Sequence, residues 1–315
     1  MTETSALLFP GQGSQTLGMG RDLAETYQAA RDTFTEADDV LGLALSTICF
    51  EGPEEVLNDT INTQPAIFVT SLAALRALQG EGWAASPKFT AGHSLGEYSA
   101  LVAAGALTFA DGLRLVRERG RLMKEAGQRN PGGMAAIIKI DDATVADICR
   151  RASHETGKVV QVANYNSPGQ VVISGDNIAL DAAMEMAKAA GARRVVRLAV
   201  SIAAHSQLMA VIADEFRRAV EETPLQPPQV PVIANITARP LNTVDDIHQE
   251  MVGQLTSSVR WVDSVETMIA QGVNRFVEIG PKDVLTGLVQ RISKEVQAVT
   301  CGTADEVKRR AEDKR

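Results

Sequence analysis

The stretch Phe89-Thr-Ala-Gly-His-Ser-Leu-Gly-Glu97 predicts a strand that turns directly into a helix of small residues. At the turn, Gly92-His-Ser-Leu-Gly96 fits the G-x-S-x-G pattern of a nucleophile elbow. Glycines two residues either side of the serine let neighbouring backbone pass close by. The serine hydroxyl is then presented at a helix N-terminus, where free amides and the dipole stabilise a developing oxyanion. Ser94 is therefore a candidate nucleophile, the alternative being an ordinary glycine-rich turn with a solvent-facing serine.

Outward from this turn, short apolar runs alternate with helical patterns, which predicts an α/β fold with a mostly parallel sheet. Further strands are expected at residues 6–9, 275–279 and 296–300, and a helix at 284–292. The charged tail, residues 304–315, is expected to fray.

The middle of the chain predicts a unit of its own, with the elements strand 134–140, helix 142–152, strands 159–165 and 170–174, helix 178–190, and strand 194–200. This βαββαβ order is the ferredoxin-like arrangement. We therefore expect a ferredoxin-like small domain over residues 130–200, inserted into a large α/β domain built from 1–129 and 201–315.

Composition narrows the class of protein. The chain has 315 residues, 45% of them hydrophobic and 22% charged, which is ordinary for a globular protein. Its net charge of −8 argues against nucleic acid or an anionic membrane as the main partner. No apolar run reaches the roughly 18 residues of a membrane span, and residues 1–10 do not resemble a signal peptide, so we expect a cytoplasmic protein. The scattered cysteines and histidines lack metal-ligand spacing, so no metal is expected.

A serine nucleophile needs a base, and His205 is the preferred candidate. His93 is adjacent to Ser94 and points the opposite way if both lie on a strand, while His154 and His248 lie in polar, surface-like stretches. His205 follows the strand at 194–200 and precedes a helix expected near residue 206, where an imidazole is biased toward its neutral form. No acidic residue stands clearly between Ser94 and His205 to orient the imidazole, because the nearest, Asp176 and Asp181, fall in the small domain. A backbone carbonyl or a two-residue dyad are the alternatives.

Arg119 breaks the pattern of an amphipathic helix expected at about 110–127, capped by Thr108. At 3.6 residues per turn it falls near the middle of the apolar face. A buried guanidinium needs an anion or a hydrogen-bonding cage. It can form a structural salt bridge in the core, or it can act as a fork that binds a substrate carboxylate. Only the second alternative connects it to Ser94.

Taken together, segments spread over nearly the whole chain resemble the malonyl-CoA:acyl carrier protein transacylase family. The matching segments are Phe9-Pro-Gly-Gln-Gly-Ser-Gln15, Gly92-His-Ser-Leu-Gly-Glu97, Arg119-Gly-Arg-Leu-Met123, Ala163-Asn-Tyr-Asn-Ser-Pro-Gly-Gln170, His205-Ser-Gln-Leu-Met209, Gln254-Leu255, Val259-Arg-Trp261 and Glu278-Ile-Gly-Pro281. The resemblance implies an α/β-hydrolase-like large domain with a ferredoxin-like insert.

The resemblance also implies a role for particular residues. Ser94 is the nucleophile, and His205 is the base. The backbone amides of Gln12 and Leu95 form the oxyanion hole, and Arg119 binds the free malonyl carboxylate. A backbone carbonyl at Gln254 orients the histidine.

By the same resemblance, the expected reaction moves a malonyl group from coenzyme A to the phosphopantetheine thiol of acyl carrier protein, for fatty acid or polyketide synthesis. No metal or redox cofactor is expected, and a monomer suffices. The small Ala204 beside His205 leaves room for a methylmalonyl group. An acidic carrier protein would need a local basic patch, for which Arg193, Arg194 and Arg197 are candidates. The rival functions are a hydrolase built on the same elbow and a catalytically silent carrier-binding scaffold.

Overall fold

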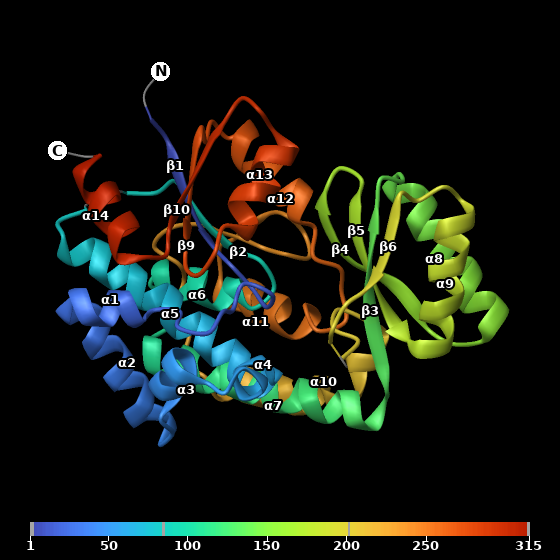
Figure 1. Cartoon of the computed structure of the whole chain (residues 1–315), viewed down its shortest axis with the longest axis horizontal. Coiled ribbons are helices and arrows are strands. Elements are labelled where there is room, and N and C mark those ends of the chain that lie inside the picture. The colour runs from blue at the N-terminus through green and yellow to red at the C-terminus, as the bar shows by residue number, and fades with distance from the viewer. Residues whose placement is uncertain (1–2, 84–85, 201, 314–315) are drawn as a thin grey trace.

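The computed structural model describes residues 3–83, 86–200 and 202–313. It contains two sheets, which Figure 1 shows in separate parts of the molecule. The larger sheet has the strand order β10-β9-β1-β2-β7-β8. Its strands are β1 (Ser5–Phe9), β2 (Phe89–Gly92), β7 (Val232–Ile233), β8 (Pro240–Leu241), β9 (Arg275–Ile279) and β10 (Gln297–Cys301). Every pairing in it is parallel except β7 with β8, which confirms the mostly parallel sheet.

Helices cover both faces of this sheet. Successive residues of β1 point to opposite sides, so that Leu7 and Phe9 join the apolar core on one face, and Ala6 and Leu8 join the core on the other. The first face carries α1 (Arg21–Thr26), α2 (Gln28–Leu41), α3 (Leu45–Glu51), α4 (Glu54–Asn58), α5 (Thr60–Gly80), α6 (Gly96–Ala103), α7 (Phe109–Arg129), α10 (Ala213–Glu222) and α11 (Val244–Gly253). The second carries α12 (Trp261–Ala270) and α13 (Val284–Ile292).

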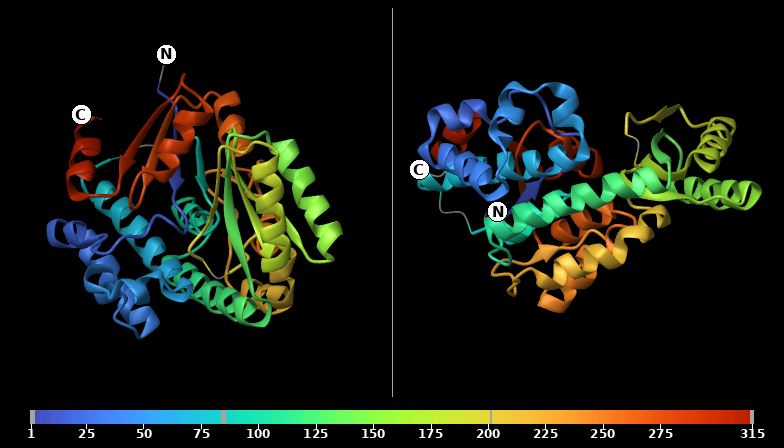
Figure 2. Two further views of the ribbon diagram at one scale, coloured as in Figure 1. Left: turned by 45° about the vertical axis from the view of Figure 1, so that its right-hand side comes forward. Right: turned by 90° about the horizontal axis from the view of Figure 1, so that it is seen from below.

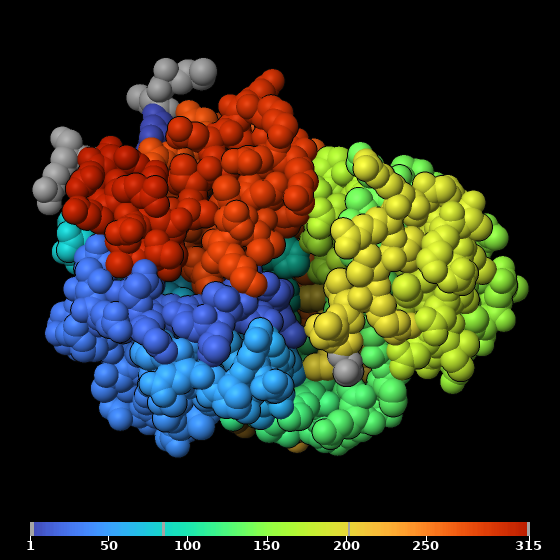
Figure 3. Space-filling model, in the orientation of Figure 1, coloured from blue at the N-terminus to red at the C-terminus, as the bar shows by residue number. Residues whose placement is uncertain are grey.

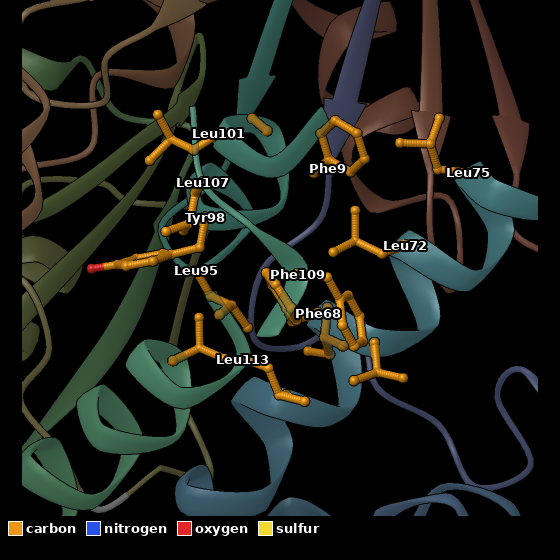
Figure 4. Packing of buried hydrophobic residues seen from close by; sticks show 14 of the residues in the cluster. Phe9, Phe68, Leu72, Leu75, Leu95, Tyr98, Leu101, Leu107, Phe109 and Leu113 are labelled. Atoms are coloured by element: carbon orange, nitrogen blue, oxygen red, sulfur yellow. The ribbon is translucent and has the colours of Figure 1, made fainter. Parts of the chain in front are cut away.

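Helix α5 is buried on nearly every side, which is unusual for a helix of a globular domain. Its Phe68 stacks on Phe109 of α7 with ring centroids 5.7 Å apart, in the cluster that Figure 4 shows in close-up. Leu72 and Leu75 of the same helix extend this cluster toward β1. The packed core fixes α5, α6 and α7 relative to one another, and these helices carry part of the site described below.

The smaller sheet is antiparallel, with the order β4-β5-β3-β6. Its elements follow the predicted sequence of strands and helices: β3 (Gly132–Ile138), α8 (Asp142–Thr156), β4 (Val160–Ser167), β5 (Gln170–Asp176), α9 (Asn177–Ala189) and β6 (Arg194–Arg197). The helices pack on one face of the sheet around a separate apolar core. Strand β6 ends earlier than expected, because residues 198–200 turn away to line a cavity between the two sheets.

Backbone hydrogen bonds join the two parts. Val259 donates its amide to the carbonyl of Ala163 (2.8 Å) and accepts from the amide of Tyr165 (2.9 Å). The hydroxyl of Ser258 also donates to the carbonyl of Val162 (2.5 Å). The middle of β4 is therefore tied to the segment of the larger part that directly precedes Trp261. Figure 2 shows the long helix α7 running from beneath the large sheet to the start of β3.

The prediction that the C-terminal tail frays is wrong for the described residues. Residues 304–312 form α14 (Ala304–Glu312), which begins with a capping box between Thr303 and Glu306. Val307 and Ala311 are buried against the first core. Charge density misled the prediction, because most of the charged side chains of α14 lie on its exposed face, and Arg310, which is largely covered, is paired with Asp313. Across the described ranges, no helix combines the length and the apolar character needed to cross a bilayer.

Candidate active site

The structure places Ser94 in the predicted turn between β2 and α6. Its φ is +53°, a left-handed conformation that non-glycine residues rarely adopt. The two flanking positions must be glycine, because other backbone atoms approach them too closely to leave room for a side chain. A Cβ on Gly92 would lie 1.9 Å from the carbonyl carbon of Gly96, and one on Gly96 would lie 2.0 Å from the carbonyl oxygen of Phe9. The G-x-S-x-G pattern is therefore a packing requirement of this elbow.

His205 lies against the serine, as the sequence predicts. Its Nε2 is 2.7 Å from Oγ of Ser94, and its Nδ1 is 2.8 Å from the backbone oxygen of Gln254. A carbonyl oxygen can only accept, so Nδ1 carries the proton and Nε2 is left to accept from the serine hydroxyl. Asp176 caps α9 and Asp181 pairs with Arg197, so neither acidic residue orients the imidazole.

The predicted reason for a neutral His205 needs correction. His205 precedes only a short 3₁₀-helix (Gln207–Ile212), capped by Ser206, rather than an α-helix. The pKa of His205 is lowered to about 3, mainly because burial penalises the charged imidazolium and next because the Arg119 guanidinium repels it. Burial, and not a helix terminus, keeps the imidazole neutral.

Arg119 is buried on the inner face of α7, as predicted from the helical periodicity. Its Nη1 donates to Oε1 of Gln64 (2.6 Å), and its Nη2 donates to Oε1 of Gln254 (2.9 Å) and to Oγ of Ser94 (3.3 Å). The guanidinium also lies 5.6 Å from the ring centroid of Tyr98. Among the described residues no carboxylate pairs with it, and its Nε has no partner. The structural salt bridge is therefore not formed, and a positive charge beside the serine is held by neutral oxygens.

Gln12 and Leu95 both line the cavity that contains Ser94. Gln12 lies in the loop after β1, where its side chain accepts a hydrogen bond from Thr60 (3.0 Å). Leu95 is the N-cap residue of α6. In the described part of the chain, neither backbone amide donates to another backbone or side-chain group. Both are free to bind an anionic oxygen.

These groups meet at the bottom of a cavity of about 500 Å³ between the two sheets. Figure 3 shows the surface hollowed between the part formed by the chain ends and the part that contains the smaller sheet. Apolar side chains line its walls, among them Leu198, Val200, Val284 and Leu288. A carboxylated acyl thioester fits a cavity of this kind, which is apolar with a few convergent polar groups. Among residues 3–83, 86–200 and 202–313, no cluster of His, Cys, Asp or Glu is suited to hold a metal ion.

The remaining histidines do not contact Ser94 Oγ. His93 points to the smaller sheet, where its Nε2 lies 2.8 Å from Oδ1 of Asn166. His154 is exposed on α8, and His248 is half-buried on α11. Their positions agree with the choice of His205.

Sequence reasoning missed Gln64, Asn235 and the side chains of Glu97 and Gln254. Gln64 holds Arg119, while Asn235 accepts from the backbone amide of Ser94 (2.7 Å). Gln64 gives no clear local signal, because it follows Asn62 and Thr63 in a polar first turn of α5. Asn235 lies in an irregular segment after β7 and gives none either.

Comparison with known proteins agrees with this geometry. Residues 6–313 match the family model described as "Acyl transferase domain". The chain is 47% identical over 287 residues to the malonyl CoA-acyl carrier protein transacylase of Escherichia coli K12, covering 91% of this chain and 92% of the relative. It is 44% identical over 294 residues to the protein of the same name from Bacillus subtilis 168, covering 93% and 92%.

Solved structures are equally similar. An acyl carrier protein S-malonyltransferase from Vibrio cholerae superposes with a TM-score of 0.93 at 43% identity, covering 98% of this chain and 99% of the other. A malonyl-transacylase solved in complex with a type II PKS acyl-carrier protein gives 0.95 at 42% identity, covering 99% and 100%. With matches over nearly its whole length, and with an arginine that has no carboxylate partner among the described residues beside a serine–histidine pair, the chain belongs to the acyl transferase domain family, among the malonyl CoA-acyl carrier protein transacylases.

Proposed function

We propose that this protein transfers a malonyl group from coenzyme A to the phosphopantetheine thiol of acyl carrier protein through an acyl-serine intermediate. One observation carries the proposal. Arg119 has no carboxylate partner among the described residues, and its Nη2 lies 3.3 Å from Oγ of Ser94. The same Oγ is hydrogen-bonded to Nε2 of His205. A nucleophile beside an unneutralised guanidinium suits an acyl group that bears its own carboxylate.

In the first half-reaction, Nε2 of His205 takes the proton of Ser94 as Oγ attacks the thioester carbonyl carbon. The oxyanion of the tetrahedral intermediate is stabilised by the backbone amides of Gln12 and Leu95. The intermediate collapses by breaking the carbon–sulfur bond. His205 returns its proton to the leaving thiolate, so coenzyme A departs as a thiol and malonyl remains esterified to Ser94.

In the second half-reaction, the carrier thiol enters the space that coenzyme A has left. It gives its proton to His205, and its sulfur attacks the ester carbonyl. Oγ of Ser94 then leaves and regains the proton from His205. Because the carbonyl of Gln254 is neutral, the imidazolium formed in each half-reaction is stabilised less than by a carboxylate.

Arg119 would select acyl groups that carry a carboxylate. A malonyl carboxylate bound to the guanidinium would form a charge-assisted, bidentate hydrogen bond. Acetyl-CoA would leave the same guanidinium without an anion, and a site built for a polar partner rejects a substrate that lacks it. The lack of an acidic partner for His205 among the described residues counts against the rival hydrolase, and the intact pair of Ser94 and His205 counts against the silent scaffold.

One experiment separates the three functions. The protein is incubated with radiolabelled malonyl-CoA, with and without phosphopantetheinylated carrier protein. A transferase gives stable label on the protein that is chased onto the carrier and is absent in Ser94→Ala. Ser99→Ala is a matched control, because this buried hydroxyl of α6 has no hydrogen-bond partner among the described residues. Rapid release of free malonate would favour the hydrolase, and a protein without label would favour the scaffold.

We also propose a more detailed assignment of the two domains. The parallel sheet and the elbow support an α/β-hydrolase-like large domain of residues 1–129 and 201–315. The βαββαβ order and the separate apolar core support a ferredoxin-like small domain over 130–200.

We further propose a cytoplasmic monomer that needs no metal or cofactor and serves fatty acid or polyketide synthesis. Ala204 lines the cavity beside His205, which supports tolerance of methylmalonyl groups. An acidic carrier would dock on local basic residues. Arg197 is already paired with Asp181, so Arg193 and Arg194 are the better candidates.

A further inference from the structure

A buried carboxylate lies directly behind the nucleophile and takes no part in the reaction proposed above. Glu97 is in the first turn of α6, and the residue is 1% exposed. Its Oε1 accepts from the backbone N (2.9 Å) and Nδ2 (3.0 Å) of Asn235, and its Oε2 accepts from Nε2 of Gln254 (2.5 Å). Among the described residues it forms no ion pair with a lysine or arginine. Burial raises the pKa of Glu97, and the nearby Glu250 raises it further.

Glu97 helps to fix which way two amide side chains point, together with the carbonyl of Gly92, which accepts from Nδ2 of Asn235 (2.7 Å), and the backbone of Ser94. The oxygen and nitrogen ends of an amide are nearly the same size, so hydrogen-bond partners select between the two orientations. Each of the three hydrogen bonds of the Glu97 carboxyl is accepted from an N–H donor. Asn235 and Gln254 both turn their NH₂ groups toward Glu97, and their oxygens face the other way.

The oxygen of Asn235 consequently faces the nucleophile. Its Oδ1 accepts from the backbone amide of Ser94 (2.7 Å), and Nε2 of Gln254 donates to the carbonyl of Ser94 (3.1 Å). The peptide groups on both sides of Ser94 Cα are held by the two amides that Glu97 orients. A left-handed serine persists only where its surroundings over-determine its conformation.

The oxygen of Gln254 consequently faces Arg119, at 2.9 Å from Nη2. If the side-chain amide of Gln254 were rotated by 180°, its NH₂ group would face the NH₂ group of the guanidinium. Two donors cannot form a hydrogen bond with each other. A neutral oxygen at this place fixes the direction of the guanidinium, and it leaves the positive charge available to a substrate anion. A carboxylate in direct contact would fix the guanidinium equally well but would neutralise that charge.

We propose that Glu97 is a positioning residue for acyl-group selectivity, acting through the amide of Gln254 on Arg119 and through Asn235 on Ser94. The inference rests on the proposed roles of Ser94 and Arg119. It assigns to the residue that directly follows the elbow motif a function in the preference for carboxylated acyl groups.

The test is Glu97→Gln, with kcat/KM measured for malonyl-CoA and acetyl-CoA in transfer to carrier protein. A glutamine can either donate or accept, so it no longer enforces the orientation of Gln254, which then depends on the Ser94 carbonyl and the Arg119 guanidinium. We expect the malonyl-to-acetyl ratio to fall about tenfold, because a misplaced positioning group costs up to about 100-fold in rate. Glu250→Gln is the matched control. Its buried carboxyl accepts from the backbone amide of Ile236 (2.9 Å) and has no hydrogen bond with the Gln254 side chain, so this variant should keep the ratio.

Equal losses for both acyl groups in Glu97→Gln, with the ratio unchanged, would reduce Glu97 to a structural role and overturn the inference. A second variant, Gln254→Met, keeps the carbonyl that orients His205 and covers the case in which Glu97→Gln does not fold. It should lower the ratio by itself, and combining the two changes should lower it no further, because both break one chain of hydrogen bonds. An unchanged ratio in Gln254→Met, or additive changes in the double variant, would contradict the inference. A wild-type protein without malonyl preference would instead refute the proposed function.

Discussion

Nδ1 of His205 lies 2.8 Å from the backbone oxygen of Gln254, at the position where a serine hydrolase triad has a carboxylate. The side chain of the same glutamine holds Arg119. One residue therefore orients the His205 imidazole through its backbone oxygen and the Arg119 guanidinium through its side chain. The orientation of the imidazole cannot be lost by substitution of Gln254, whereas the position of the guanidinium can.

Arg119→Ala should lower kcat/KM for malonyl transfer by about 100-fold or more, because a hydrogen-bonded charge pair contributes about 1.5–3 kcal/mol and its direction is lost as well. Acetyl transfer should fall much less, so relative preference moves toward acetyl. Competition between the two thioesters for carrier protein measures the change. Arg121→Ala on the same helix, which removes exposed ion pairs with Glu118 and Glu215, is the control. Undiminished malonyl transfer in Arg119→Ala would remove the carboxylate-binding role.

The acylation rate should be free of an inflection near pH 6.5. The pKa of His205 is lowered to about 3, so the base stays neutral throughout pH 5–8. Single-turnover labelling of Ser94 across this range is the measurement. In Arg119→Ala, the pKa of His205 should rise, because the repulsion from the guanidinium, which helps to lower this pKa, is removed. A rate that halves near pH 6.5 in the wild-type protein would show that the imidazole is not held neutral by burial.

The same lowered pKa has a consequence for stability. Between about pH 6.5 and pH 3, the unfolded chain protonates this histidine and the folded protein does not. The unfolded state therefore binds more protons, and the contribution of His205 to the free energy of unfolding is lost as the pH falls through this window. Denaturant titrations of wild type and His205→Gln at pH 7 and pH 5 should show a smaller drop for the variant. An equal drop in both proteins would contradict the prediction.

Ala204→Val should reduce transfer of methylmalonyl more than transfer of malonyl. Ala204 lines the cavity beside His205, and added methyl groups would occupy the space next to the acyl α-carbon. One methylene in an apolar pocket changes selectivity by about 10-fold or more. The two thioesters are compared as the ratio of kcat/KM values, so malonyl-CoA is the internal control. An unchanged ratio would mean that the α-substituent lies elsewhere in the cavity.

Thr303→Ala should lower the free energy of unfolding by about 1 kcal/mol, because it removes the N-cap of α14. Chemical denaturation with a fluorescence or circular dichroism readout measures this. Malonyl transfer should not change, because Thr303 does not line the active-site cavity. No loss of stability would indicate that the capping box contributes little in solution.

Periodicity and motif predicted much of this molecule. The βαββαβ order, the mostly parallel sheet and the elbow around Ser94 all follow from local patterns of apolar residues and glycines. The inward position of Arg119 follows from helical spacing alone. These predictions succeed because strand and helix periods directly determine which side chains face the core. The tail was mispredicted because two buried residues, Val307 and Ala311, were outweighed by their charged neighbours.

The sequence by itself predicted that Ser94, His205 and the buried Arg119 are the candidate site residues, because each is marked by a local pattern. Only the tertiary structure decided how they are held. Gln64 lies 55 positions from Arg119, to which it is hydrogen-bonded. Asn235 and Gln254 lie 141 and 160 positions from Ser94, whose backbone they hold. Hydrogen bonds between such distant residues depend on how helices and loops pack, and local spacing does not encode that packing. The absence of a carboxylate beside Arg119 among the described residues is likewise a property of the folded core.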